Sequence, residues 1–547
     1  MTTPDKDEKI GGGGGGAATS VQDVLPTSPH VDASSSSVDH KSLVDTPSRE
    51  DASDEQAPSY SNKYGGISEL LGLGDRPPPA QVAWTGKRSW FRSTFTQATI
   101  LGMCSFLSPG LWGALAALGA GGSQNVSTVN AANSLTFGLM VLTAAFTSAL
   151  VNVTSIKFAL IFGTMGYAPY AAGLYLNSKT GAQWLVIFGA ACCGVSAGVF
   201  WSAEGAIILA YPERRRQARY ISYWLMFRVL GQLLGGIINL SLNANNSEAG
   251  SISLDTYLVF VILQCLAPFC AMLLSPPHRV QRTDKTPVYL NINTSTRNEL
   301  CRMWKTVTSP KVLLLLPMIW QGTWSEALIG TYAAIHFTVR SRALGSLLSA
   351  VCASLCNYAL GFYLDWKRPA INTRAKSAFL AVYSLQAGLW IWAIYIMHEY
   401  TETKPTLDWT SDGYGRGFAL YIFLQVGFNM MYEYVYFLIG HINDDPGEIV
   451  RIASVVRGIE SAGQAVSYGV NSTGLRLDAV AGINMAQWAI CLVPAWLVIR
   501  KLGILADGTR IHEARIYAPE EKREALKKSG IREAEHDGTG DVLERRQ

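Results

Sequence analysis

Long apolar runs separated by short polar connectors dominate the sequence between about residues 95 and 500. Most of these runs are close to the ~20 residues that an α-helix needs to cross the hydrocarbon core of a membrane. The pattern therefore predicts an all-α membrane protein. The fifth and eleventh of the expected spans are the least apolar. Twelve transmembrane helices are predicted, at about 95–119, 130–151, 155–176, 182–211, 219–243, 254–274, 311–335, 343–364, 375–397, 416–440, 449–473 and 478–499.

The composition supports a membrane protein rather than a water-soluble one. Hydrophobic residues make up 49% of the chain and charged residues 16%, whereas a soluble domain carries roughly a quarter charged residues. Residues 1–90 differ from the rest, because they contain the glycine run 11–16 and the serine run 34–37 among scattered charges. Such a segment buries too little apolar surface to offset its chain entropy, so we expect a disordered tail.

The arrangement of the predicted helices suggests two halves. A six-helix half at 91–274 and a second at 311–500 flank a polar central loop at 275–310, and a charged tail follows at 501–547. Lysine and arginine are concentrated in the segments on the N-terminal side of the membrane, which places both termini in the cytosol. Two six-helix halves are the layout of the major facilitator fold, with a substrate site near the membrane midplane.

Charged residues inside the predicted spans are the main candidates for function. Each costs about 2.5–3.5 kcal/mol on the insertion scale and therefore needs a compensating role or partner. They either line a substrate path or neutralise one another and hold helices together. With one neighbouring glutamine, the candidate substrate-binding or coupling residues are Glu204, Arg228, Glu326, Glu433, Arg457, Glu460 and Gln464.

Polar residues form stripes on the tenth and eleventh expected spans. In the eleventh span, five polar side chains lie within an arc of about 80° at 100° per residue: Arg457, Glu460, Gln464, Ser467 and Asn471. Arg457 and Glu460 are spaced to pair on one helix face. This stripe is either the wall of a cavity or a self-neutralising contact between helices. In the tenth span, Glu433 lies among tyrosines and is a candidate for cation recognition, for proton transfer, or for pairing with Arg228 or Arg457.

Other motifs change the picture little. The small-residue spacings Gly194–Gly198 and Gly231–Gly235 predict close helix packing. Asn125 and Asn245 begin glycosylation sequons on the predicted outer side. The sequence shows no phosphate loop, metal-ligand spacing or Ser/His/Asp arrangement, so we expect neither an enzyme nor a cofactor. The expected partners are the lipid bilayer and a small-molecule or ion substrate, or, for a regulator, another membrane protein. No nucleic acid is expected.

Several blocks between about residues 95 and 500 resemble the UNC-93-like family, a divergent branch of the major facilitator superfamily, and especially its fungal-type members. The blocks are Phe106-Leu-Ser-Pro109-Gly110, Trp201-Ser-Ala-Glu204-Gly205, Val280-Gln-Arg282-Thr-Asp284, Tyr432-Glu-Tyr-Val-Tyr436 and Arg457-Gly-Ile-Glu460. Two positions depart from the pattern. Lys285 stands where the resemblance leads us to expect glycine, and Glu460 occupies a position that is often glutamine.

The resemblance implies a membrane protein whose activity follows one of two patterns. Fungal-type members include proteins that look like efflux proteins, so we expect a transporter or efflux protein for a small organic molecule or ion in the plasma membrane or an endomembrane. The alternative is a non-transporting regulator or trafficking chaperone of another membrane protein, as in animal members. Gly361 to Arg368 resembles the superfamily's loop signature, but its first-half counterpart, Asn152 to Lys157, is degenerate, which favours the alternative somewhat.

Overall fold

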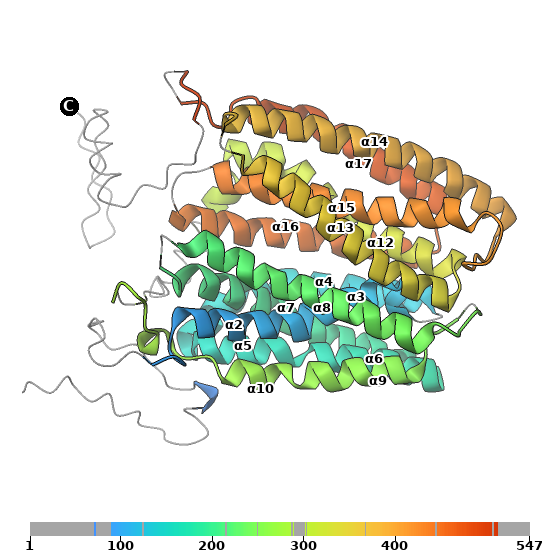
Figure 1. The fold of residues 1–547 in the computed structure, drawn as a ribbon, viewed down its shortest axis with the longest axis horizontal. Coiled ribbons are helices and arrows are strands. Elements are labelled where there is room, and N and C mark those ends of the chain that lie inside the picture. The colour runs from blue at the N-terminus through green and yellow to red at the C-terminus, as the bar shows by residue number, and fades with distance from the viewer. Residues whose placement is uncertain are drawn as a thin grey trace, which may run out of the picture. The chain divides into compact units, whose positions relative to one another are not determined.

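Helices make up nearly all of the chain that the computed structural model describes, which is residues 70–72 and 89–511 apart from 123–124, 214–215, 249, 286–287, 289–300, 302–303, 367, 443–445 and 506–507 (Figure 1). The tails expected at 1–90 and 501–547 therefore lie largely outside the described residues, and so does part of the central loop expected at 275–310. The helices are α2 (Thr94–Ser105), η1 (Phe106–Gly110), α3 (Leu111–Ala117), η2 (Ala120–Gly122), α4 (Val126–Val153), α5 (Ile156–Met165), α6 (Tyr167–Thr180), α7 (Gln183–Ala210), α8 (Gln217–Asn243), α9 (Leu254–Cys265), α10 (Ala267–Met272), η4 (Pro277–Arg279), α12 (Pro310–His336), α13 (Val339–Leu364), α14 (Ile371–Thr403), α15 (Tyr414–Ile442), α16 (Pro446–Ser472) and α17 (Leu477–Ile499).

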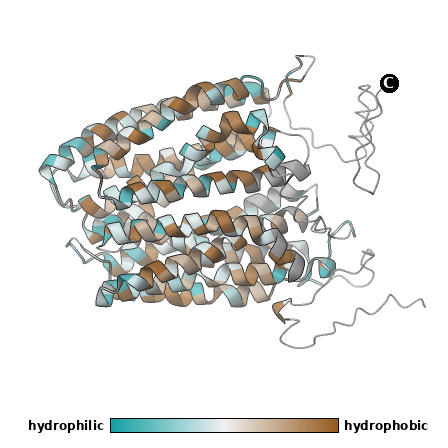
Figure 2. Ribbon diagram, turned by 180° about the vertical axis from the view of Figure 1, so that it is seen from behind, coloured by the Kyte–Doolittle hydropathy of each residue, from teal (hydrophilic) through white to brown (hydrophobic). Residues whose placement is uncertain are grey.

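Within the described residues, ten helical stretches are long and apolar enough to cross a membrane, and apolar residues run along their length (Figure 2). The all-α membrane architecture is thereby confirmed. The fifth expected span is not weakly apolar, because Tyr223–Asn243 has the same hydropathy as Thr94–Ala117. The two expected spans outside the ten are the third, which divides at Gly166 into α5 and α6, and the eleventh, α16, which carries several charges.

The packing of the helices follows one pattern twice. We define the first set as α2 to α10 (residues 94–272) and the second set as α12 to α17 (residues 310–499). In the first set α8 packs on α2 and α3, and α4 packs on α7. In the second set α16 packs on α12, and α13 packs on α15. The two sets lie side by side (Figure 1) and meet where α4 contacts α16 and α8 contacts α13.

Glycines allow α8 to approach the first span closely. The span contains a π-helical turn, η1, with Pro109 inside it, and Pro109 has no N–H to donate. A Cβ added at Gly231 would lie 2.7 Å from the Phe106 carbonyl oxygen, and one at Gly110 would lie 3.0 Å from the Arg228 carbonyl oxygen. The packing role of the glycine spacing in α8 is confirmed, and it fixes the Arg228 backbone beside the π turn.

Hydrogen bonds join the two sets at the end of the bundle where α3 leads to α4. Ser127 Oγ donates to the Ser472 carbonyl at 2.6 Å, and the Tyr421 hydroxyl donates to the Ala117 carbonyl at 2.6 Å. The start of α13 also donates backbone hydrogen bonds to segment 246–248. This end, which the charge distribution predicts to be the outer one, is therefore held together by contacts between sets.

At the opposite end, the segment after α10 is fastened to the end of α7. Arg282 donates to the carbonyls of Ala210 and Tyr211. Glu213 accepts hydrogen bonds from Thr283 N and Oγ1, each at 2.7 Å. Burial acts to raise the pKa of Glu213, but the hydrogen bonds from Thr283 outweigh it and the pKa is lowered. Lys285, which replaces the expected glycine, has φ of 58°, a left-handed conformation that glycine adopts without strain.

Candidate functional site

The indole ring of Trp201, on α7, lies beneath two guanidinium groups. Arg457 Cζ is 4.3 Å from the ring centroid and Arg228 Cζ is 5.4 Å from it, while Arg228 Cζ is also 5.9 Å from the centroid of Tyr432. Cations over aromatic faces are stabilised by roughly 0.5–2 kcal/mol each. Both helix sets contribute to the arrangement. We call the residues gathered here the central cluster: Trp201, Glu204, Arg228, Glu326, Tyr432, Tyr436, Arg457, Glu460 and Gln464.

Arg457 and Glu460 form the ion pair that their spacing predicted. Arg457 Nη1 lies 3.3 Å from Glu460 Oε2, and the side chains are 18% and 1% exposed. Tyr436 OH donates to the same carboxylate oxygen at 3.1 Å, and Arg457 Nη1 donates to Tyr432 OH at 3.3 Å. The tyrosines on α15 and the charged pair on α16 therefore bind one another, while Arg457 Nε has no partner among the described residues.

A second carboxylate of the cluster is held by the same helix. Gln464, one turn beyond Glu460 on α16, donates from Nε2 to Glu326 Oε2 on α12 at 2.5 Å. Gln464 is buried, and its Oε1 has no partner among the described residues. The polar stripe predicted on the eleventh span thus reaches across to the seventh.

Glu204 lies at the first-set side of the cluster and is fully buried. Its Oε1 accepts hydrogen bonds from Ser105 Oγ and from Trp224 Nε1, the latter at 2.5 Å. Its Oε2 has no partner among the described residues. Sequence reasoning missed Ser105 and Trp224. Trp224 precedes Arg228 by four residues, and that spacing, which puts both on one face of α8, is the signal that could have identified it.

Glu433 lies apart from the central cluster. Its Oε1 faces α13, where a Cβ added at Gly361 would lie 2.7 Å away, and its Oε2 has no partner within the described chain. The suggested pairing with Arg228 or Arg457 is wrong, because one residue turns the helix by 100° and takes Glu433 off the face that carries Tyr432. Of the seven candidates from the sequence, the structure therefore brings six together.

The two sequon residues differ in their surroundings. Asn125 caps the start of α4, where its side chain accepts a hydrogen bond from Thr128 N at 3.2 Å. Asn245 is exposed in the segment that follows α8. Glycosylation of either residue stays a prediction.

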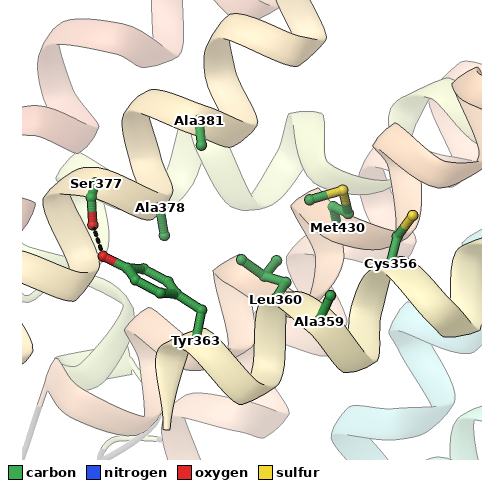
Figure 3. A pocket seen from close by; sticks show the side chains of 8 residues that line it. All are labelled: Cys356, Ala359, Leu360, Tyr363, Ser377, Ala378, Ala381 and Met430. Atoms are coloured by element: carbon green, nitrogen blue, oxygen red, sulfur yellow. Dashed lines mark hydrogen bonds between the residues drawn. The ribbon is translucent and has the colours of Figure 1, made fainter. Parts of the chain in front are cut away.

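Two clefts lie on the bundle away from the central cluster. One, of about 370 Å³, is formed by α13, α14 and α15 and is lined mostly by apolar side chains (Figure 3). Its polar contact is the hydrogen bond between Tyr363 OH and Ser377 Oγ. The other, of about 860 Å³, lies between α4 and α16, where small residues such as Gly138 and Gly469 line it. Among the described residues that line these two clefts, none is charged, so none could fix a ligand by its charge.

Comparison with known proteins places these features in a family context. Residues 129–361 match the family model described as ion channel regulatory protein UNC-93. The chain is 42% identical over 464 residues to notoamide biosynthesis cluster protein O' of Aspergillus versicolor, covering 84% of this chain and 97% of that protein. It is 27% identical to an UNC93-like protein of Schizosaccharomyces pombe, over 79% of this chain and 89% of that one.

Comparison with solved structures shows the fold alone. A POT family transporter, solved in complex with a thioalcohol-conjugated peptide, matches with a TM-score of 0.51 at 13% identity. The match covers 73% of this chain and 96% of the transporter.

Proposed function

The chain belongs to the UNC-93-like family, and from that membership we propose that it is a transporter or efflux protein for a small organic molecule or ion. It is a multi-pass membrane protein of major facilitator-like fold. We place it in the plasma membrane or an endomembrane, and we propose no enzymatic activity.

The proposal includes two six-helix halves at 91–274 and 311–500 with both termini in the cytosol. The repeated helix pairing within the two sets supports the halves. The third and eleventh spans complete the count of twelve. Together α5 and α6 run from Ile156 to Thr180 with one residue between them, and α16 has 27 residues, so each is long enough to cross. Arg457 and Glu460 of α16 pair with each other and contact side chains of α7 and α15, and a bundle tolerates charges in such an arrangement.

The observation that carries the transport proposal is the cation–π contact between Arg457 of the second set and Trp201 of the first. In the major facilitator fold the halves rock about a site near the midplane. A charged cluster shared by both sets changes its contacts when the sets move, so a ligand bound there is coupled to the movement. Hydrogen bonds join the sets at the predicted outer end, which favours access to the cluster from the cytosolic end in this state.

The second candidate is a non-transporting regulator or chaperone of another membrane protein. The family description, an ion channel regulatory protein, favours it. The central cluster would then only hold the two sets together, and the partner would bind on a lipid-facing surface.

One experiment distinguishes the transporter from the regulator. Metabolites and ions are measured in cells that lack the protein. The cells are complemented with the wild type, with the double variant Arg457→Gln/Glu460→Gln, or with the control Arg416→Gln/Glu399→Gln. The control removes an exposed ion pair of 2.8 Å outside the cluster. Because one relative is named for a biosynthesis cluster, the profile includes secondary metabolites.

Transport predicts that one solute accumulates without the protein, and that the wild type and the control clear it while the cluster variant does not. Mislocalisation or altered activity of a membrane partner, with no change in any solute, would support the regulator instead.

A further inference from the structure

We propose that Arg228 is the docking point for the carboxylate group of an organic anion, and that this anion is the transported solute. The inference rests on the proposed transport function and adds the chemical class of the substrate. It comes from the state of Arg228, which differs from that of the other charged residues in the central cluster.

The guanidinium group of Arg228 makes no hydrogen bond and no ion pair with any residue that the structure describes. Its contacts are the faces of Trp201 at 5.4 Å and Tyr432 at 5.9 Å. An arginine side chain carries five N–H donors and stays charged. The carboxylates of Glu204, Glu326 and Glu460 compensate its charge only through space, and a charge held in a membrane span without a direct polar partner is costly to keep. Such a cost is characteristic of residues retained for a ligand rather than for stability.

The remaining charged groups of the cluster already have partners. Arg457 has Glu460, Glu326 accepts from Gln464, and Glu204 accepts from Trp224. A cationic ligand would have to compete with these donors at the partnered carboxylate oxygens. Glu204 Oε2 has no partner among the described residues, but the Glu204 side chain is fully buried. An anionic ligand would instead supply the acceptor that Arg228 lacks, without breaking an existing contact.

The surroundings select the kind of anion. A guanidinium group presents paired N–H donors in a plane that matches both oxygens of a carboxylate. Trp201 and Tyr432 are half-buried aromatic side chains, and they offer apolar surface for the hydrocarbon part of the ligand. The three carboxylates of the cluster disfavour a second negative charge on that ligand. The site therefore fits an organic monocarboxylate better than a small inorganic anion.

The position of Arg228 also links the ligand to the movement of the two sets. Arg228 and Trp201 belong to the first set, whereas Tyr432 belongs to the second. The backbone of Arg228 is fixed against the π turn by Gly110 and Gly231. An anion bound at the guanidinium group would thus be held by a rigid part of the first set while touching the second.

The test uses the purified full-length protein and three probes of one shape and different charge. Phenylacetate is the anion, phenylacetamide is its neutral analogue, and phenethylammonium is the cation. Ligands that bind the folded state raise the midpoint of thermal unfolding, and the rise grows with the logarithm of ligand concentration over Kd. Sodium chloride at equal concentration controls for ionic strength and for binding of an inorganic anion.

We expect phenylacetate alone to raise the midpoint of the wild type. Arg228→Gln should weaken the apparent affinity about 10- to 100-fold, because a charge-assisted hydrogen bond is lost, and Arg228→Lys should weaken it less. Arg416→Gln removes an exposed arginine at the start of α15, outside the central cluster, and should leave the affinity unchanged. Without ligand, Arg228→Gln should unfold at the wild-type temperature or above, whereas a structural arginine would lower it.

Equal stabilisation by chloride, phenylacetamide or phenethylammonium would overturn the inference, as would unchanged phenylacetate binding to Arg228→Gln. The same probes, radiolabelled, are then exchanged across proteoliposomes that contain the wild type. Exchange of phenylacetamide or phenethylammonium but not of phenylacetate would refute the assignment of an organic anion as the substrate. It would leave the proposed transport function intact. No exchange of any probe, together with no change of any solute in the deletion cells, would count against both.

Discussion

Arg457 Cζ lies 4.3 Å from the centroid of the Trp201 ring, and this contact joins helix α16 to helix α7. The two residues are far apart in the sequence and lie in different helix sets. Trp201 is therefore the point at which the charged face of the second set rests on the first.

The buried ion pair between Arg457 and Glu460 is expected to show strong coupling. Arg457→Gln should destabilise the protein by about 3 kcal/mol, because it leaves a buried carboxylate without its cation. The double variant Arg457→Gln/Glu460→Gln should recover most of that loss. Thermal unfolding of the wild type, both single variants and the double variant gives the coupling directly. Additive effects of the two changes would show that the groups do not interact.

Substitutions of the two intramembrane glutamates on α7 and α15 should have different effects. Glu204→Gln changes a fully buried carboxyl that accepts hydrogen bonds from Ser105 and Trp224, and it should reduce transport at least about tenfold, the effect of ~1.4 kcal/mol. Glu433→Gln alters a group that faces Gly361, and it should change transport less than about twofold, within ~0.4 kcal/mol. Initial rates in vesicles with equal protein content measure both. A larger loss for Glu433→Gln would place it in the transport path.

Lys285 occupies a backbone conformation that favours glycine. Its φ of 58° lies in the left-handed region, which costs an L-residue with a side chain roughly 1–2 kcal/mol. Lys285→Gly should therefore stabilise the protein by up to about 1 kcal/mol, since the greater freedom of glycine in the unfolded chain offsets part of the gain. Lys285→Ala is the matched control and should give no gain. An equal gain from alanine would attribute the effect to the lost charge.

Asp408 should make stability at the predicted outer end depend on pH. Its carboxylate accepts hydrogen bonds from Arg340 Nε and Thr338 Oγ1, each at 2.7 Å. Arg340 is the main cause that lowers the pKa of Asp408 below its ordinary value, and threonine hydroxyls add to it. A lowered folded-state pKa stabilises the protein above the unfolded-state pKa of about 3.9, and the contribution is lost as pH falls below it.

The comparison of wild type with Asp408→Asn tests this dependence. The wild type should have the higher unfolding temperature near pH 7, and the difference should shrink as the pH falls from about 5 to 3. A difference that stays constant over this range would mean that the charge of Asp408 contributes nothing to stability.

The sequence predicted the helices well and the site only in part, for reasons visible in particular residues. The apolar runs located the spans, and helical spacing correctly paired Arg457 with Glu460. Periodicity within one helix does not say which helix lies opposite, so the contact of Arg457 with Trp201 could not be derived. The same limit applies to Ser105, which looks like any small polar residue in a span until the fold places it against Glu204.

The most direct test of the central claim is flux of the solute identified in the deletion cells through purified protein in proteoliposomes. The wild type and the exposed-pair control Arg416→Gln/Glu399→Gln should exchange the labelled solute at equal rates. The cluster variant Arg457→Gln/Glu460→Gln, confirmed to be folded, should not exceed empty vesicles. Equal flux through the cluster variant and the wild type would contradict the assignment of the central cluster, and absence of flux through the wild type would contradict transport itself.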